Sequence, residues 1–217
     1  ITFFFVPLVR LVTMGLHEQN RTGTAQRYVG WSRFGEVLTS DDFLEGVRIS
    51  ATYVLFTVPV GVVLGILLAV AADRRLRGIA VFRAVFSSTI ASSVAVASVV
   101  FLVLLNPQIG YFSSIRAFSL SDPDTALRGV ALSSVWQNLG LTFVIVTAGL
   151  QAVPDEVQEA ATLDGYGPLR RLFRVTLPLI SPTLAFLAVV LVVFALQAFA
   201  QVDILTDGGP RGATATR

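Results

Sequence analysis

The stretch VRISATYVLFTVPVGVVLGILLAVAA, residues 47–72, decides the fold, because its one charged residue, Arg48, lies near its start. A helix needs about 20 predominantly apolar residues to cross the hydrocarbon core of a bilayer. The stretch therefore predicts one membrane-spanning helix. Pro59 removes a backbone hydrogen bond from the middle of this helix, which predicts a bend there.

Other apolar runs repeat the pattern along the chain. Three are long enough to span a bilayer, namely 81–105, 130–150 and 182–204. Residues 1–16 form a shorter run, which we interpret as the second half of a spanning helix whose start is missing. No run alternates polar and apolar residues as a barrel strand does. We expect an all-α, polytopic transmembrane helix bundle with five spans, the first partial, in a single transmembrane domain over 1–217 that is a fragment of a longer chain.

The composition agrees with this reading and excludes other classes of protein. Apolar residues make up 54% of the chain and charged residues 14%, whereas soluble domains carry about 25% charged residues. Intrinsic disorder, a secreted disulfide scaffold and an ordinary soluble enzyme are therefore excluded. The net charge of +2 is too small to indicate a nucleic-acid partner.

The residue types that are missing from the sequence limit its chemistry. Every basic residue is Arg, so the chain lacks the Lys of a phosphate-binding loop and has no nucleotide-hydrolysing site of that kind. It has no Cys and a single His, His17, so neither a Cys/His zinc site nor a Ser-His-Asp or Cys-His relay is expected. We expect no catalytic residue, no metal and no cofactor bound by this chain.

Polar side chains in the middle of the predicted spans form pairs that are candidates for a functional role. A polar group in a bilayer is costly unless it is paired or faces water. Each pair is spaced i, i+4, which places both members on one helix face. The residues are Ser88 and Ser92, Asn138 and Thr142, and Gln197 and Gln201. Two interpretations stay open: hydrogen bonds between helices, or the lining of a cavity for a hydroxyl-rich solute.

Residues 151–182, QAVPDEVQEAATLDGYGPLRRLFRVTLPLISP, form a polar connection that is expected to fold into two short helices. Pro154 suits the start of the first helix and Gly165 its stop, and Gly167-Pro168 suits the start of the second. The connections 73–83 and 151–181 hold more Arg for their length than the others, chiefly through Arg74, Arg75 and Arg77 after the span 47–72, and this places both on the cytoplasmic side. Two roles stay open for these helices: lying on lipid headgroups, or docking a cytoplasmic partner.

At this connection the sequence resembles a known family. Glu159-Ala160-Ala161, then Gly165, then Val175-x-Leu177-Pro178 is similar to the EAA motif, EAA-x3-G-x9-I-x-LP, of the permease subunits of ABC importers. Val175 replaces the Ile of the motif. The likeness continues in residues 28–56 and in LTDGGPRGATAT, where Asp207 stands in place of a frequent Gly. The group that the sequence resembles most is the carbohydrate-type permeases for sugars and glycerol phosphates.

The resemblance implies a division of labour between subunits. Two permease subunits, the second a different chain, would form the path through the bacterial inner membrane. A cytoplasmic ABC ATPase dimer would bind ATP and Mg, and an extracytoplasmic binding protein would deliver the solute. The loop at 151–181 would couple ATP binding to the helices. The coupling residues implied by the resemblance are Glu159, Ala160, Ala161, Asp164, Gly165, Gly167, Leu177 and Pro178.

The resemblance also implies a sixth span, which is absent from this sequence. It favours a sugar or sugar-like solute, with glycerol 3-phosphate or glycerophosphodiesters as the alternative. An ion-coupled transporter or channel is the competing class, but such proteins place ionisable groups inside the membrane. Here the charged residues of the spans lie near their ends; they are Arg10, Arg48, Arg83 and Asp203.

Overall fold

The computed structural model describes residues 2–19, 26–28, 30–72, 79–108, 110–112, 115–207 and 214. Its contacts fall into two compact units, 1–48 with 217, and 49–216. The division runs through a single continuous helix, so the prediction of one domain over 1–217 stays a prediction. Arg74, Arg75, Arg77 and most of LTDGGPRGATAT lie outside the described residues.

The first unit holds the first apolar run as one helix. The elements are α1 (Thr2–Gly15), β1 (His17–Gln19), β2 (Gln26–Tyr28), α2 (Ser32–Leu38) and the start of α3. β1 and β2 pair antiparallel with His17 opposite Tyr28, which adds a short hairpin to the predicted all-helical fold. A Cβ on Gly15 would lie 3.0 Å from Cζ of Phe34, so α1 packs closely on α2.

Among the described residues, two helices are each long and apolar enough to cross a membrane. They are α3 (Asp41–Ala72), which covers the stretch 47–72, and α6 (Pro123–Gln151), which covers 130–150. The α3 helix is continuous through Pro59. At the start of α6, the Asp122 carboxylate accepts a hydrogen bond from the backbone N–H of Asp124 at 3.1 Å, and Pro123 occupies the first turn.

The run predicted as one span over 81–105 is instead a bent pair of helices. The chain forms α4 (Ile79–Ser87), the 3₁₀ turn η1 (Ser88–Ala91) and α5 (Val94–Leu104). The axes before and after the break differ by 105°. Ser92 and Ser93 are extended, with ψ of 135° and 151°, and the Ser93 hydroxyl caps α5 by accepting from the N–H of Val96. The single straight helix expected here is therefore wrong.

The last run is also divided. After η2 (Arg116–Phe118), α6 and α7 (Asp155–Leu163), the chain forms α8 (Pro168–Arg171), the π-helical turn η3 (Leu172–Thr176) and α9 (Leu177–Leu179), followed by α10 (Ser181–Leu196) and α11 (Phe199–Thr206). The direction changes by 71° at Ile180, and a second break at Gln197 and Ala198 separates α10 from α11. Counting each bent pair as one span gives up to four spans among the described residues.

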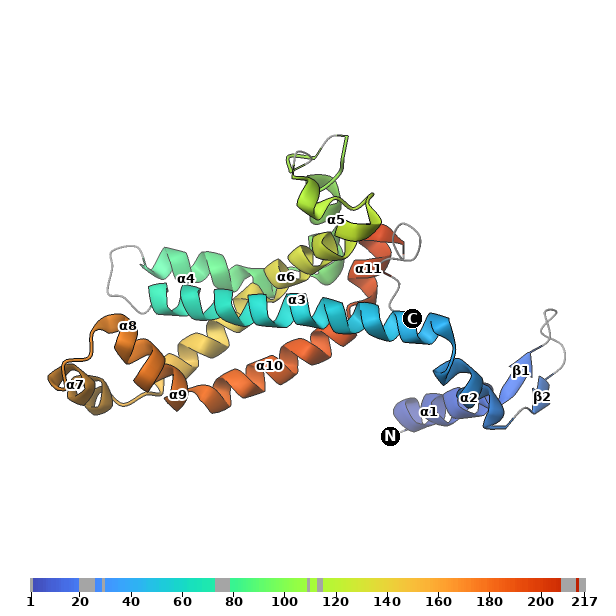
Figure 1. Ribbon diagram of the computed structural model, residues 1–217, viewed down its shortest axis with the longest axis horizontal. Coiled ribbons are helices and arrows are strands. Elements are labelled where there is room, and N and C mark those ends of the chain that lie inside the picture. Colours follow the sequence, from blue (N-terminus) through green and yellow to red (C-terminus); the bar gives the residue numbers. More distant parts are fainter. Residues whose placement is uncertain are drawn as a thin grey trace. The chain divides into compact units, whose positions relative to one another are not determined.

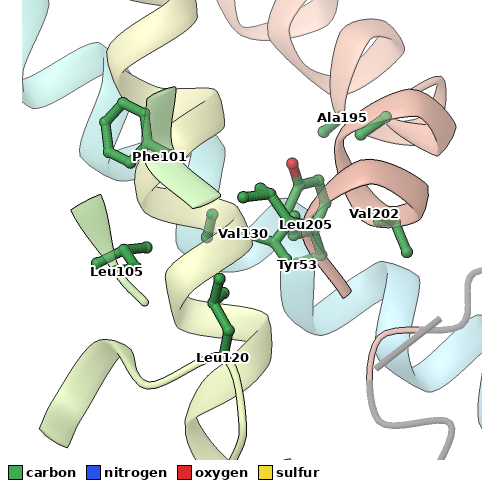
Figure 2. Close-up of a cluster of buried hydrophobic side chains, with 10 residues drawn as sticks. Tyr53, Phe101, Leu105, Leu120, Val130, Ala195, Val202 and Leu205 are labelled. Carbon is green, nitrogen blue, oxygen red and sulfur yellow. The ribbon is translucent and has the colours of Figure 1, made fainter. Parts of the chain in front are cut away.

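The α6 helix lies at the centre of the second unit. It contacts α4, η1, α5, α10 and α11, and Figure 1 shows it, in yellow, between α4 and α10. In the most apolar 18-residue window of α6, 56% of the residues are buried, against 28% for α3. Tyr53 of α3, Val130 of α6 and Leu205 of α11 converge in one of the two apolar clusters (Figure 2).

Two small residues of α3, Gly61 and Gly65, form a Gly-x-x-x-Gly row, and Gly65 allows α3 to approach α6. A Cβ on Gly65 would lie 2.1 Å from Cγ2 of Thr142, a distance that no side chain tolerates. Gly61 is less constrained, because its Cβ would meet Leu191 at 3.5 Å, which is ordinary contact. Gly65 is therefore the member of the Gly-x-x-x-Gly row that packing requires.

Candidate functional site

A cavity of about 600 Å³ is lined by three parts of the second unit: the break between α4 and α5, the middle of α6, and the break between α10 and α11. Its apolar wall comes from side chains such as Leu141 and Phe194. Its polar lining consists of amide and hydroxyl side chains from α6 and from these two breaks. These are Ser92, Ser93, Ser134, Gln137, Asn138, Gln197 and Gln201. We call this space the break cavity.

The break between α4 and α5 and the break between α10 and α11 explain why the cavity is polar. Backbone that leaves the helical form at membrane depth is tolerated where it lines a cavity or is buried in protein, because its polar groups otherwise lose their partners. At the first break Ser92 and Ser93 are extended, and at the second Gln197 ends α10. Each break thus opens toward the same space.

Side chains of α6 fix the wall of the cavity. The Gln137 amide donates from Nε2 to the carbonyl of Ser92 at 2.8 Å, and the Ser92 hydroxyl donates to Oε1 of Gln137 at 3.3 Å. Asn138 donates from Nδ2 to the carbonyl of Ser134 at 2.9 Å. The Ser134 hydroxyl is hydrogen-bonded in turn to the phenol of Tyr53, which is buried in α3.

Two amides are left available for a ligand. Gln201 is 7% exposed and makes no side-chain hydrogen bond to any described residue. Its amide atoms are not among the buried polar atoms that lack a partner, so they are accessible, and Gln201 lines the break cavity. Gln197 is exposed and also makes no side-chain hydrogen bond within the described part of the chain. The Oδ1 atom of Asn138 adds a third free group on the same wall.

Four of the six predicted pathway residues, Ser92, Asn138, Gln197 and Gln201, therefore meet at one cavity. Ser88 does not: it is exposed, it bonds only the carbonyl of Val85, and the 3₁₀ turn that follows separates it from Ser92. Thr142 does not either, because it is fully buried against Gly65 and donates to the carbonyl of Asn138. Ser88 and Thr142 therefore do not share this cavity with their partners, and their place in a transport path stays a prediction.

Sequence reasoning missed Ser93, Ser134 and Gln137. Ser134 lies four residues before Asn138, so the i, i+4 rule that paired Asn138 with Thr142 also points to Ser134. Gln137 is an amide in an apolar run and carries the same signal as Asn138. The position of the break at Ser92 and Ser93 has no comparable signal.

The connection at 151–181, which we call the coupling loop, folds into the two predicted helices. The first, α7, begins with Asp155 and Glu156 in its first turn and is preceded by Pro154. It ends in a Schellman motif, in which Tyr166 donates to the carbonyl of Ala161 and Gly165 to that of Thr162, both at 3.0 Å. The helix stops at Gly165 as expected, and the φ of +76° there shows that this stop is left-handed.

The second helix is held against the first by three side-chain contacts. Gln158 donates to Oγ1 of Thr176 at 3.3 Å, and Arg171 donates to Oγ1 of Thr162 at 2.8 Å. The guanidinium of Arg170 lies 4.4 Å from the centre of the Tyr166 ring. The coupling loop is thus a defined helical hairpin.

The residues implied in coupling are exposed, with two exceptions. Ala161 is buried, and Leu177 is half-buried within the turn that follows η3. The exposed residues are Glu159, Ala160, Asp164, Gly165, Gly167 and Pro178. Apolar side chains accompany them: Leu163 is 89% exposed, Leu169 72% and Phe173 64%.

Comparison with known proteins identifies the class of the molecule. A family model described as the binding-protein-dependent transport system inner membrane component matches residues 61–217. The sn-glycerol-3-phosphate transport system permease protein UgpA of Agrobacterium fabrum is 32% identical, and the match covers 100% of this chain and 76% of the relative. The UgpA of Yersinia enterocolitica is 31% identical, with 99% and 75% covered.

Two solved structures share the fold. One is a bacterial ABC transporter involved in the import of the acidic polysaccharide alginate, with a TM-score of 0.70, 21% identity, and coverage of 93% of this chain and 69% of that chain. The other is the bacterial alginate ABC transporter in complex with an alginate pentasaccharide-bound periplasmic protein, with a TM-score of 0.75, 20% identity, and coverage of 99% and 74%.

The fold and these matches define a transmembrane permease component of an ABC transporter. The chain belongs to the family of binding-protein-dependent transport system inner membrane components, of the carbohydrate type. The resemblance identified from the EAA motif and the all-α transmembrane fold are confirmed. The roles of the individual site residues stay predictions.

Proposed function

We propose that this permease carries a neutral, hydroxyl-rich solute, a sugar or a sugar-like molecule, through the break cavity into the cytoplasm of a bacterium. The observation that carries the proposal is the lining of the cavity by seven amide and hydroxyl side chains. Amides and hydroxyls both donate and accept hydrogen bonds, as the hydroxyls of a sugar do. Gln201 lines the cavity and its amide makes no hydrogen bond to a described residue, so it is suited to such a ligand.

A phosphorylated solute is the second candidate, supported by one feature of the cavity. The α5 helix begins at Ser93 and Val94, which both line the cavity, and the N-terminus of a helix attracts anions. The relatives named for sn-glycerol 3-phosphate agree with this candidate. Against it, the lining residues carry amides and hydroxyls, whereas a phosphate usually draws on Arg.

The coupling loop would dock a cytoplasmic ATPase dimer that binds ATP and Mg. The exposed Leu163, Leu169 and Phe173, beside the small residues Ala160 and Gly165, support this role, because they offer apolar contact and close backbone approach. A second permease chain would complete the path across the inner membrane. A substrate-binding protein outside it would deliver the solute, as the family description implies.

Uptake into proteoliposomes that hold the complete transporter tests the proposal. Labelled disaccharide, glycerol 3-phosphate and an amino acid are compared, each with and without internal ATP. We expect ATP-dependent uptake of the disaccharide, and uptake of glycerol 3-phosphate alone would favour the second candidate. Transport of the amino acid alone, or uptake driven by an ion gradient without ATP, would overturn the assignment.

Variants connect the uptake to the cavity. Gln201→Leu and Asn138→Leu should lower disaccharide uptake at least about tenfold, because each removes an amide that solute hydroxyls would bind. Ser88→Ala is the matched control, since its hydroxyl bonds only the neighbouring turn and lies outside the cavity. Equal uptake by all three variants would separate transport from this cavity.

A further inference from the structure

Two sets of hydrogen bonds hold the break between α4 and α5 to α6, one from the backbone of α6 and one from a side chain of α6. Gly140 donates its backbone N–H to Oγ1 of Thr89 at 2.8 Å, in a buried contact. Gln137 holds Ser92 through its side-chain amide, using both Nε2 and Oε1. Both contacts bridge α6 and the segment in which the helix axis turns by 105°.

Only the second of these contacts borders the break cavity. Thr89 is 8% exposed, and a Cβ on Gly140 would lie 2.4 Å from its Oγ1, so this contact is closely packed. Thr89 and Gly140 are not among the lining residues, whereas Gln137 and Ser92 both are. A solute in the cavity therefore reaches the Gln137 amide without displacing the Thr89 contact.

We propose that Gln137 is the positioning residue through which a solute in the break cavity changes the bend between α4 and α5. The inference rests on the proposed function. Without solute, both ends of the Gln137 amide are used by Ser92. A hydroxyl-rich solute presents donors and acceptors of the same kind, so exchanging one set of neutral hydrogen bonds for the other changes the free energy little.

Release of Ser92 leaves one hydrogen bond between the described residues of the bend and α6, the one at Thr89, while α5 still packs on α11 and α6. Ser92 is extended and lies between a 3₁₀ turn and the start of α5, so rotation about its backbone redirects α5 without breaking either helix. A solute that binds the released arrangement better shifts the population toward it. Gln137 thereby couples occupancy of the cavity to the direction of α5.

Spin labels test this coupling directly, because the chain has no native Cys. Cysteines are placed at Val81 on α4 and Val103 on α5, which are 67% and 52% exposed. The distance between the two labels is measured by pulsed electron resonance in the complete transporter, with and without disaccharide. Uptake by the same preparation is measured in parallel.

We expect disaccharide to shift the distance distribution of the parent protein. In Gln137→Met, which keeps the length of the side chain but makes no such hydrogen bonds, the solute-free distribution should already be displaced, and disaccharide should change it at most half as much. Ser92→Ala removes the 3.3 Å bond to Gln137 and the 2.9 Å bond that the same hydroxyl donates to the Thr89 carbonyl. It keeps the 2.8 Å bond from Gln137 to the backbone carbonyl of residue 92, so it should show a smaller displacement. It serves as the second variant if Gln137→Met does not assemble. Gln197→Met lines the cavity away from the bend and should keep the solute-free distribution of the parent.

The outcomes separate this inference from the proposed function. The inference is wrong if the parent imports disaccharide but the distance between its labels does not change. It is also wrong if the Gln137→Met or Ser92→Ala variant responds to disaccharide as fully as the parent does. In both cases the transport assignment stands. If the parent imports neither disaccharide nor glycerol 3-phosphate, the proposed function fails and the inference fails with it.

Discussion

At the scale of single residues, two glycines, Gly165 and Gly65, are required for different physical reasons. Gly165 adopts a φ of +76° with no atom within 4 Å of a Cβ built on it, so conformation alone requires glycine there. Gly65 lies in an ordinary helix, and the proximity of Thr142 requires it. The two positions respond to substitution for different reasons.

Gly165→Leu should prevent co-purification of the ATPase and abolish transport. The left-handed conformation costs a branched residue about 1–2 kcal/mol, and the Leu side chain would cover the surface beside Ala160. Gly165→Asn is the control, because Asn tolerates this conformation, and it should keep more of the ATPase bound. Pull-down of the tagged complex measures both. Full binding and transport by Gly165→Leu would contradict a docking role for the loop.

Gly65→Ala should destabilise the helix bundle by about 1–3 kcal/mol, since the added methyl group overlaps Cγ2 of Thr142. Thr142→Ser removes that methyl group and keeps the hydroxyl that donates to Asn138. The double variant should recover most of the loss. Thermal unfolding in detergent measures the three variants, and additive effects would show that the two residues do not interact.

At the scale of elements, proline accompanies one helix break and not the other: Pro178 and Pro182 flank the 71° break at Ile180. The α3 helix is continuous through Pro59, whereas the 105° break occurs at Ser92 and Ser93, with no proline or glycine at the break itself. Apolar pattern predicts how many residues a run offers to the bilayer. It carries no information on tertiary contacts such as those of Gln137 and Gly140, which hold the break in place.

Cysteine labelling distinguishes cavity residues from packing residues within the predicted pairs. In the otherwise Cys-free protein, Cys at positions 197 and 201 should react with a polar thiol reagent, and disaccharide should slow the reaction. Cys at 142 should stay unlabelled, because Thr142 is fully buried against α3. Fast labelling at 142, or none at 197 and 201 in any state, would contradict the assigned cavity.

At the scale of the whole molecule, the class of protein could be predicted from the sequence, and the shape of the site only in part. The apolar runs and the EAA motif were sufficient for the class, because both are local patterns. Asn138, Gln197 and Gln201 were predicted as a cavity lining from their cost in a bilayer, and they do lie together. Ser88 and Thr142 satisfied the same criterion, but they bond their own helices.

The isolated chain should hydrolyse no ATP, since it contains no Lys to bind nucleotide phosphates. Hydrolysis should appear only when the ATPase subunits are added, and Gly165→Leu should reduce its stimulation by the binding protein. Phosphate release from purified preparations measures this. ATP hydrolysis by this chain alone, after removal of co-purifying ATPase, would contradict the division of labour.

The π-helical turn η3 has a consequence for insertions and deletions. Leu177 donates to the carbonyl of Leu172, five residues back, so this turn holds one residue more than an α-helical turn does. The extra residue relieves the crowding that the Pro178 ring would cause in a regular helix. A chain shortened by one residue here would rotate α8 by about 100° relative to α10. Leu169 would then point elsewhere while every transmembrane segment kept its length, so this loop tolerates substitution more readily than a change in its number of residues.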